Sequence, residues 1–177
     1  MKMNNENIAQ KTRELVLQIK QALIERGEMM ATAESCTGGL IASDIVSEAG
    51  SSEILAGGIV AYQNQVKQDL LGVPAQVLAE KGAVSAETVT AMAKGAREKF
   101  GCDWAVATSG IAGPGGAEPG KPVGFVWMCV NSRWQNEAFS EIFDGNRNEI
   151  REKSVYRVLS KLLFLINNQK STCTNEH

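Results

Sequence analysis

Helix-like and strand-like segments alternate along this chain of 177 residues, and that alternation most restricts the folds open to it. Apolar residues recur at helical spacing over roughly 6–26, and a short apolar run over 29–34 follows at once. The same change of period is repeated further along the chain. Short buried strands interleaved with helices are typical of a sheet covered by helices on both faces. We therefore predict an α/β fold, a three-layer α/β/α sandwich with a mixed, mostly parallel sheet.

Capping and turn residues give approximate bounds to the other elements. Ser85 is expected to cap a helix that Gly101 ends, with Val89, Met92, Ala93 and Ala96 on its inner face. The remaining expected elements are a helix over 37–50, a buried strand over 54–62, a short helix over 63–71, an irregular segment over 72–83, a strand over 104–108, a glycine-rich loop over 110–121, a strand over 123–130, a turn over 131–134, an antiparallel strand over 138–143 and a closing helix over 149–167.

Length and charge limit the organisation and the partners of the chain. We expect one domain over 1–168 and a disordered tail over 169–177. The net charge of -2 and the scattered Lys and Arg residues argue against a nucleic-acid partner. No apolar run approaches the roughly 20 residues of a membrane span, so we expect a cytoplasmic protein without membrane contact. A homo-oligomer is left open, because the apolar stripe of the first helix fits a neighbouring subunit or its own sheet equally well.

Cysteine and histidine usage excludes several kinds of site. The four cysteines form no Cys-x-x-Cys pair, so we expect reduced thiols, at least two of them in the core, and neither a zinc site nor a disulfide framework. We expect no metal and no cofactor. The only histidine is His177, the last residue, which is poorly placed to serve a Ser-His-Asp triad.

The segment Thr32–Leu40 places a hydroxyl group, that of Ser35, at a predicted strand-to-helix junction beside Gly38 and Gly39. The amides of a helix that opens there suit a phosphate or the oxyanion of an acyl intermediate. Residues 110–116 also follow a predicted strand, so both glycine-rich segments should converge on one crevice at the carboxyl ends of the strands. Local sequence fits equally well a serine that only caps the helix.

If Ser35 is a nucleophile, another group must take its proton, and Lys67 is the best-placed candidate. A lysine desolvated in an apolar pocket can act as a general base, whereas an ordinary carboxylate is too weak. Lys67 follows the strand predicted over 54–62, and Tyr62 can lie on the same side to pass the proton or orient the amine. For an isolated lysine, however, a solvated position on a helix surface is the commoner outcome.

Two motifs in the sequence are incomplete. Gly115-x-x-x-x-Gly120-Lys121 imitates a phosphate-binding P-loop, but Pro122 stands where the Mg²⁺-binding Ser or Thr belongs. The position three residues after Ser35 is a glycine, so the Ser-x-x-Lys signature of penicillin-binding enzymes is absent. Because the P-loop is incomplete, we reject hydrolysis of nucleoside triphosphates.

Several ordered motifs resemble the CinA carboxyl-terminal domain family, the nicotinamide-nucleotide amidohydrolases, over about residues 8–165. The matching stretches are Thr32-Ala33-Glu34-Ser35-Cys36-Thr37-Gly38-Gly39, Gly58-Ile59-Val60-Ala61-Tyr62-Gln63-Asn64 with Lys67, Gly82-Ala83-Val84-Ser85, Ser109-Gly110-Ile111-Ala112-Gly113-Pro114, and Lys121-Pro122-Val123-Gly124 with Trp127. The resemblance implies metal-free deamidation of nicotinamide mononucleotide to nicotinic acid mononucleotide and ammonia. It further implies that Ser35 is the nucleophile and that Tyr62 and Lys67 assist it. A catalytically silent nucleotide-binding or regulatory protein is the alternative.

The substrate is then a small-molecule nucleotide, whose phosphate and oxyanion need amides or cations. Arg147 resembles an arginine of the family and could bind the phosphate bidentately, although an Arg147–Asp144 surface pair is nearly as good an interpretation. The substrate-binding candidates are Thr37, Gly38, Gly39, Gly110, Ala112, Gly113 and Arg147.

Overall fold

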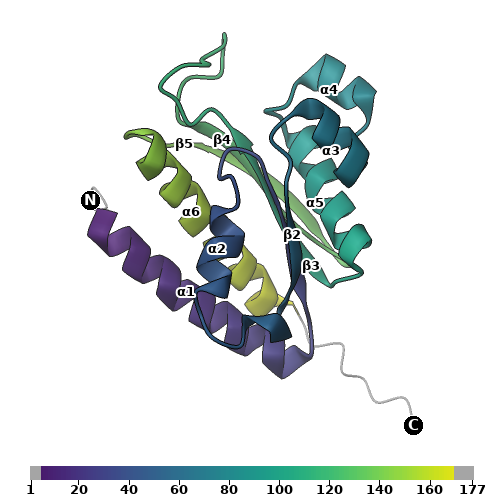
Figure 1. The fold of residues 1–177 in the computed structure, drawn as a ribbon, viewed down its shortest axis with the longest axis vertical. Coiled ribbons are helices and arrows are strands. Elements are labelled where there is room, and N and C mark those ends of the chain that lie inside the picture. Colours follow the sequence, from purple (N-terminus) through teal and green to yellow (C-terminus); the bar gives the residue numbers. More distant parts are fainter. Residues whose placement is uncertain (1–4, 170–177) are drawn as a thin grey trace.

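The computed structural model describes residues 5–169, which form a five-stranded sheet between two layers of helices (Figure 1). The predicted three-layer α/β/α fold is confirmed. The helices are α1 (Asn5–Arg26), α2 (Leu40–Val46), α3 (Asn64–Leu71), α4 (Ala75–Lys81), α5 (Ala86–Phe100) and α6 (Arg147–Asn168), with a 3-10 turn at Ser51–Glu53. The strands are β1 (Met30–Glu34), β2 (Leu55–Val60), β3 (Trp104–Gly110), β4 (Phe125–Ser132) and β5 (Asn136–Ile142).

The sheet has the strand order β2-β1-β3-β4-β5. β1 runs parallel to both β2 and β3, whereas β4 and β5 add an antiparallel hairpin, as the sequence predicts. The prediction that the strand after residue 54 is buried is wrong, because β2 lies at the sheet edge and Val60 is 51% exposed. A Cβ atom at Gly57 of β2 would lie 2.4 Å from the ring of Phe100, so glycine is needed there for α5 to pack closely on this strand.

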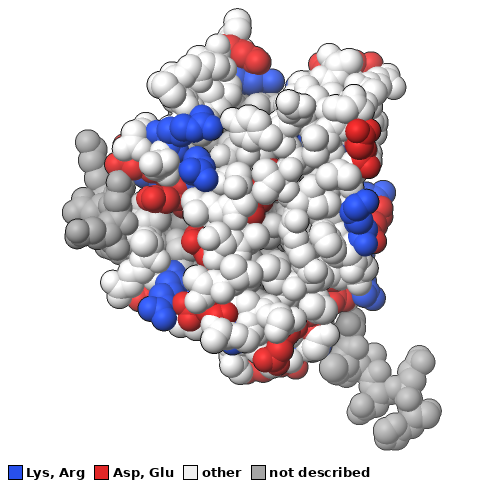
Figure 2. Space-filling view, in the orientation of Figure 1, with Lys and Arg blue, Asp and Glu red and all other residues white. Residues whose placement is uncertain are grey.

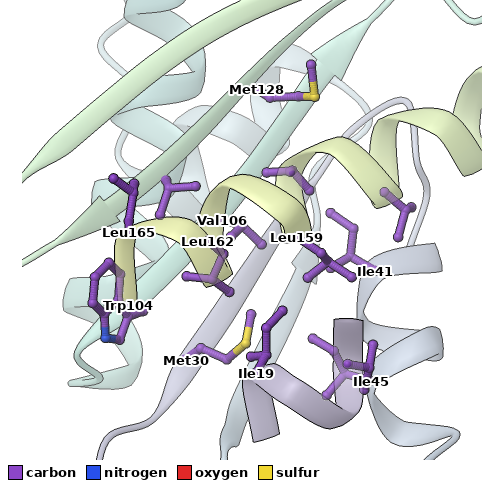
Figure 3. Close-up of a cluster of buried hydrophobic side chains, with 14 of the residues drawn as sticks. Ile19, Met30, Ile41, Ile45, Trp104, Val106, Met128, Leu159, Leu162 and Leu165 are labelled. Carbon is purple, nitrogen blue, oxygen red and sulfur yellow. The ribbon is translucent and has the colours of Figure 1, made fainter. Parts of the chain in front are cut away.

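Helices α1, α2 and α6 cover one face of the sheet and bury the larger apolar cluster (Figures 1 and 3). Strand residues Met30, Trp104 and Val106 point into this cluster and pack against side chains of α6 such as Leu162. Side chains of α6 reach this cluster because its apolar residues repeat every three or four positions, which places them on one face of the helix. Six apolar residues predict this stripe; Ile150, Val155, Val158, Leu159 and Leu162 are buried, and Leu163 is partly buried.

Helices α3, α4 and α5 cover the other face, where the strands present mainly alanines. Successive side chains of a strand point to opposite faces. Because Ala31 and Ala33 of β1 face α5, Glu34 points toward α2, and Ser35 continues the series on the α5 face. This alternation decides which side chains meet beyond the ends of the strands.

The bounds of β3, β4 and β5 differ from the sequence predictions by one or two residues, and three helices also differ. The second helix begins at Leu40 rather than near Thr37 and ends at Val46, before Gly50. Helix α4 lies in the segment predicted to be irregular; its helix-forming residues follow Pro74, which is compatible with a helix start. Helix α6 begins two residues earlier than expected, because Asn146 and Glu149 form a capping box. His177, Cys173 and the predicted tail from residue 170 onward lie outside the described residues.

The distribution of surface charge and the composition of the helices bear on the expected partners. On the face seen in Figure 2, Lys and Arg form separate groups with Asp and Glu between them, without one continuous basic patch. Of the helices between residues 5 and 169, none has the length and apolar composition required to cross a membrane.

Candidate active site

A cavity of about 200 Å³ opens at the carboxyl ends of the three parallel strands. Ser35 enters it directly after β1, Lys67 from α3, and Gly110 from the end of β3. Of the two glycine-rich segments predicted to converge on one crevice, 110–116 contributes Gly110 and Ala112 to this cavity, whereas 37–39 contributes no lining residue. The full lining consists of Ser35, Cys36, Tyr62, Lys67, Ala83, Val84, Ser109, Gly110, Ala112 and Arg147.

Lys67 and Ser35 are in direct contact. Lys67 Nζ lies 3.1 Å from Ser35 Oγ and donates to the carbonyl oxygens of Ala61 and Tyr62 at 2.8 and 3.0 Å. Lys67 is 1% exposed, and this burial lowers the pKa of its amine below the ordinary value of 10.5. Lys67 is therefore not solvated on a helix surface. Its buried amine forms a hydrogen-bonded pair with the Ser35 hydroxyl.

The position of Lys67 depends on how closely α3 packs on α5. A Cβ atom at Gly95 of α5 would lie 1.9 Å from the carbonyl oxygen of Leu71, the last residue of α3. Only glycine allows this approach of the two helices. At the other end of α3, Gln63 and Tyr62 turn the chain out of β2, which brings the Tyr62 carbonyl within reach of the amine.

Glu34 organises the loop that carries Ser35. Its carboxylate is fully buried and accepts four hydrogen bonds, from the Thr37 hydroxyl and from the amides of Gly39, Ile41 and Ala42, at 2.7 to 3.1 Å. A carboxylate is the partner that free amides at a helix N-terminus favour. The anion at the start of α2 is therefore a side chain of the protein itself.

This arrangement corrects part of the predicted substrate site. Thr37, Gly38, Gly39 and Gly113 do not line the cavity. The amide of Gly38 donates to the carbonyl of Ser35, and the amide of Gly39 donates to Glu34, so neither is free to bind an oxyanion or a phosphate in this structure. Sequence reasoning assigned these amides to a ligand because it did not consider Glu34 as their acceptor.

Arg147 and Tyr62 meet at the rim of the cavity. The Arg147 guanidinium donates to the Gly113 carbonyl at 2.7 Å and to the Tyr62 hydroxyl at 3.1 Å. Tyr62 is 60% exposed, and its main-chain carbonyl rather than its phenol contacts Lys67. The anticipated partner of Arg147, Asp144, accepts instead from Lys153.

Four lining residues carry no role in the sequence prediction: Cys36, Ala83, Val84 and Ser109. Burial raises the pKa of the Cys36 thiol to about 12, so this cysteine stays protonated beside the serine. Cys36, Cys102 and Cys129 are buried free thiols, which confirms the predicted core cysteines. Ser109 could have been found from strand alternation, because it occupies the position of β3 that corresponds to Ser35 after β1.

The fold and the site define an α/β/α protein with a buried serine–lysine pair at the carboxyl edge of a mixed sheet. Residues 12–166 match the model of the CinA C-terminal domain, and the chain belongs to this family. It is 44% identical to a CinA-like protein of Synechococcus sp. (strain CC9902) over 81% of this chain and 35% of that protein. A CinA-like protein of Geotalea daltonii is 50% identical over 77% of this chain and 33% of that protein.

The chain thus spans about a third of the length of these relatives. Solved structures share the fold, among them two crystal structures. The competence damage-inducible protein A of Klebsiella pneumoniae has a TM-score of 0.87 and 36% identity, covering 90% of this chain and 99% of its own. The competence/damage inducible protein CihA of Agrobacterium tumefaciens has a TM-score of 0.85 and 40% identity, covering 89% and 96%.

Proposed function

We propose that the chain hydrolyses a primary carboxamide with Ser35 as nucleophile and Lys67 as general base, and that its substrate is nicotinamide mononucleotide. The observation that carries this proposal is the 3.1 Å contact between Lys67 Nζ and Ser35 Oγ at the wall of a cavity. A desolvated lysine beside a hydroxyl is a known means of activating a nucleophile without histidine. The family resemblance of the motifs supports the choice of substrate.

The two carbonyl groups around Lys67 explain how the amine would act as a base. A neutral amine has two N–H groups and one lone pair. The carbonyls of Ala61 and Tyr62 can only accept, so they take the two N–H groups and leave the lone pair for the Ser35 proton. Lysine in its charged form would instead donate to all three oxygens. Burial opposes that form, as the lowered pKa of Lys67 indicates.

In the proposed reaction, Ser35 Oγ attacks the carboxamide carbon while its proton moves to Lys67 Nζ. The ammonium then protonates the amide nitrogen, the C–N bond breaks, and ammonia leaves an acyl ester on Ser35. Water attacks this ester, Lys67 takes the proton from the water and returns it to Ser35 Oγ, and the acid is released. Tyr62 assists through its carbonyl, which holds the amine in place.

Arg147 supplies the positive charge that an anionic substrate requires at the cavity rim. Its guanidinium is held by Gly113 and Tyr62 and lines the same cavity as Ser35. The oxygen atoms of a phosphate bound there would accept hydrogen bonds from the planar guanidinium of Arg147, which these two contacts already orient. Gly110 and Ala112 line the same cavity as Ser35 and Arg147, so we expect them to contact the proposed substrate.

The purified chain is expected to release ammonia from nicotinamide mononucleotide after treatment with a chelator. Ser35→Ala removes the nucleophile and is expected to reduce this release to background, with the far-UV circular dichroism unchanged. Ammonia and nicotinic acid mononucleotide are measured over time. Binding of the mononucleotide without turnover by the unaltered chain would contradict the proposal and support a regulatory protein.

Arg147→Ala is expected to raise KM for nicotinamide mononucleotide by about 10-fold or more, because a charge-assisted contact to phosphate is lost. KM for nicotinamide riboside, which lacks the phosphate, should change much less. Steady-state kinetics with both compounds provide the comparison. Equal increases for the two compounds would show that Arg147 acts only through its contacts with Tyr62 and Gly113.

A further inference from the structure

Ser109 is the polar side chain of the cavity that the proposed reaction does not use. In the parallel pairing of β1 and β3, Glu34 lies opposite Thr108, so the next residues, Ser35 and Ser109, are neighbours on the α5 face. Strands in a sheet are about 4.8 Å apart. Ser109 is 2% exposed and lines the cavity together with Ser35. It is therefore placed to touch the group on which Ser35 acts.

The hydrogen bond of Ser109 fixes what it can offer to an occupant of the cavity. Ser109 Oγ donates to the carbonyl oxygen of Ala83 at 2.8 Å. A hydroxyl has one proton, and a carbonyl can only accept, so the direction of this bond cannot reverse. The lone pairs of Oγ remain, and no side chain or amide of residues 5–169 donates to them. Ser109 thus presents a hydrogen-bond acceptor and no donor.

We propose that Ser109 is a specificity-determining residue whose hydroxyl oxygen accepts an N–H of the substrate carboxamide. A carboxamide has two N–H groups to donate, whereas an ester has none in the same place. The carboxylate of the acid product has only lone pairs, which Ser109 Oγ repels. Ser109 therefore favours amides over esters and substrate over product. This inference rests on the proposed amide hydrolysis.

The test compares nicotinamide mononucleotide with the methyl ester of nicotinic acid mononucleotide as substrates of the unaltered chain and of Ser109→Ala. We expect kcat/KM for the amide to fall about 10- to 100-fold in the variant, because a buried N–H loses its acceptor. The value for the ester should change less than about 3-fold, and inhibition by nicotinic acid mononucleotide should strengthen. Ser109→Thr, which keeps the hydroxyl, should retain the preference for the amide.

Ser154→Ala is the matched control. Its hydroxyl also donates to one carbonyl, that of Ile150, and it is fully buried but does not line the cavity. In Ser154→Ala, the ratio of kcat/KM for the amide to kcat/KM for the ester should equal that of the unaltered chain. Equal losses of both activities in Ser109→Ala would overturn the specificity role and leave the proposed function standing. An unaltered chain that hydrolyses neither compound would overturn both.

Discussion

A Lys67→Met variant is expected to release ammonia from nicotinamide mononucleotide at least about 1,000-fold more slowly than the unaltered chain. Methionine fills a similar volume but has no lone pair that can take the Ser35 proton. The amine it replaces is buried, 3.1 Å from Ser35 Oγ and bound to two carbonyls, and no other basic side chain of residues 5–169 forms a hydrogen bond with Ser35 Oγ. The loss should appear in kcat, with KM for the mononucleotide changed little.

Lys94→Met provides the control for this loss. Lys94 lies on α5 with its side chain 61% exposed, and its ion pair with Glu98 is of the kind that contributes little. Its activity should match that of the unaltered chain. Turnover by Lys67→Met at an undiminished rate would remove Lys67 as the base, whatever the substrate proves to be.

The pH dependence of the unaltered chain follows from the same lysine. Only the neutral amine can accept the Ser35 proton, so kcat/KM should rise with pH through the pKa of Lys67 and level off above it. Because burial lowers that pKa from 10.5, the rise should be complete at a lower pH than for an exposed lysine. The profile is recorded with Arg147→Ala alongside, since that variant should keep the same midpoint.

The sequence predicts the elements whose signals are local. Helix α5 has its N-cap serine and its terminal glycine, and the apolar face of α6 repeats along most of its 22 residues, so both appear close to their predicted bounds. The short helix α4 was missed, because seven residues carry too little periodicity to outweigh the glycines and proline around them. The start of α2 was misplaced because Glu34, which caps its amides, precedes the helix by six residues.

The candidate site likewise combines residues that the sequence identifies with contacts that only the packing of distant segments determines. Ser35 at a strand-to-helix junction is visible in the sequence, and the family resemblance joins Lys67 to it. Physical reasoning on the sequence alone names Lys67 as the best-placed base but favours a solvated position for it, because its burial depends on the approach of α3 to Gly95. The hydrogen-bond state of Ser109 depends on Ala83, which is 26 residues away. Such contacts between distant segments are set by packing and not by local pattern.

Glu34→Gln is expected to lower the free energy of unfolding by about 3 kcal/mol, since a buried donor without its acceptor costs roughly 1–3 kcal/mol. The carboxylate accepts from four donors on both of its oxygens. A glutamine has one acceptor oxygen, and its NH₂ group would face N–H and O–H groups that also donate. Urea unfolding followed by circular dichroism measures the change.

The comparison for this loss is Glu87→Gln, whose side chain is 48% exposed and pairs with Lys81 at 3.5 Å. It should change the free energy of unfolding by no more than about 0.5 kcal/mol. In Glu34→Gln we also expect kcat to fall, because the loop that α2 and Glu34 hold carries Ser35 toward Lys67. If Glu34→Gln were as stable and as active as Glu87→Gln, Glu34 would not be what holds the nucleophile in place.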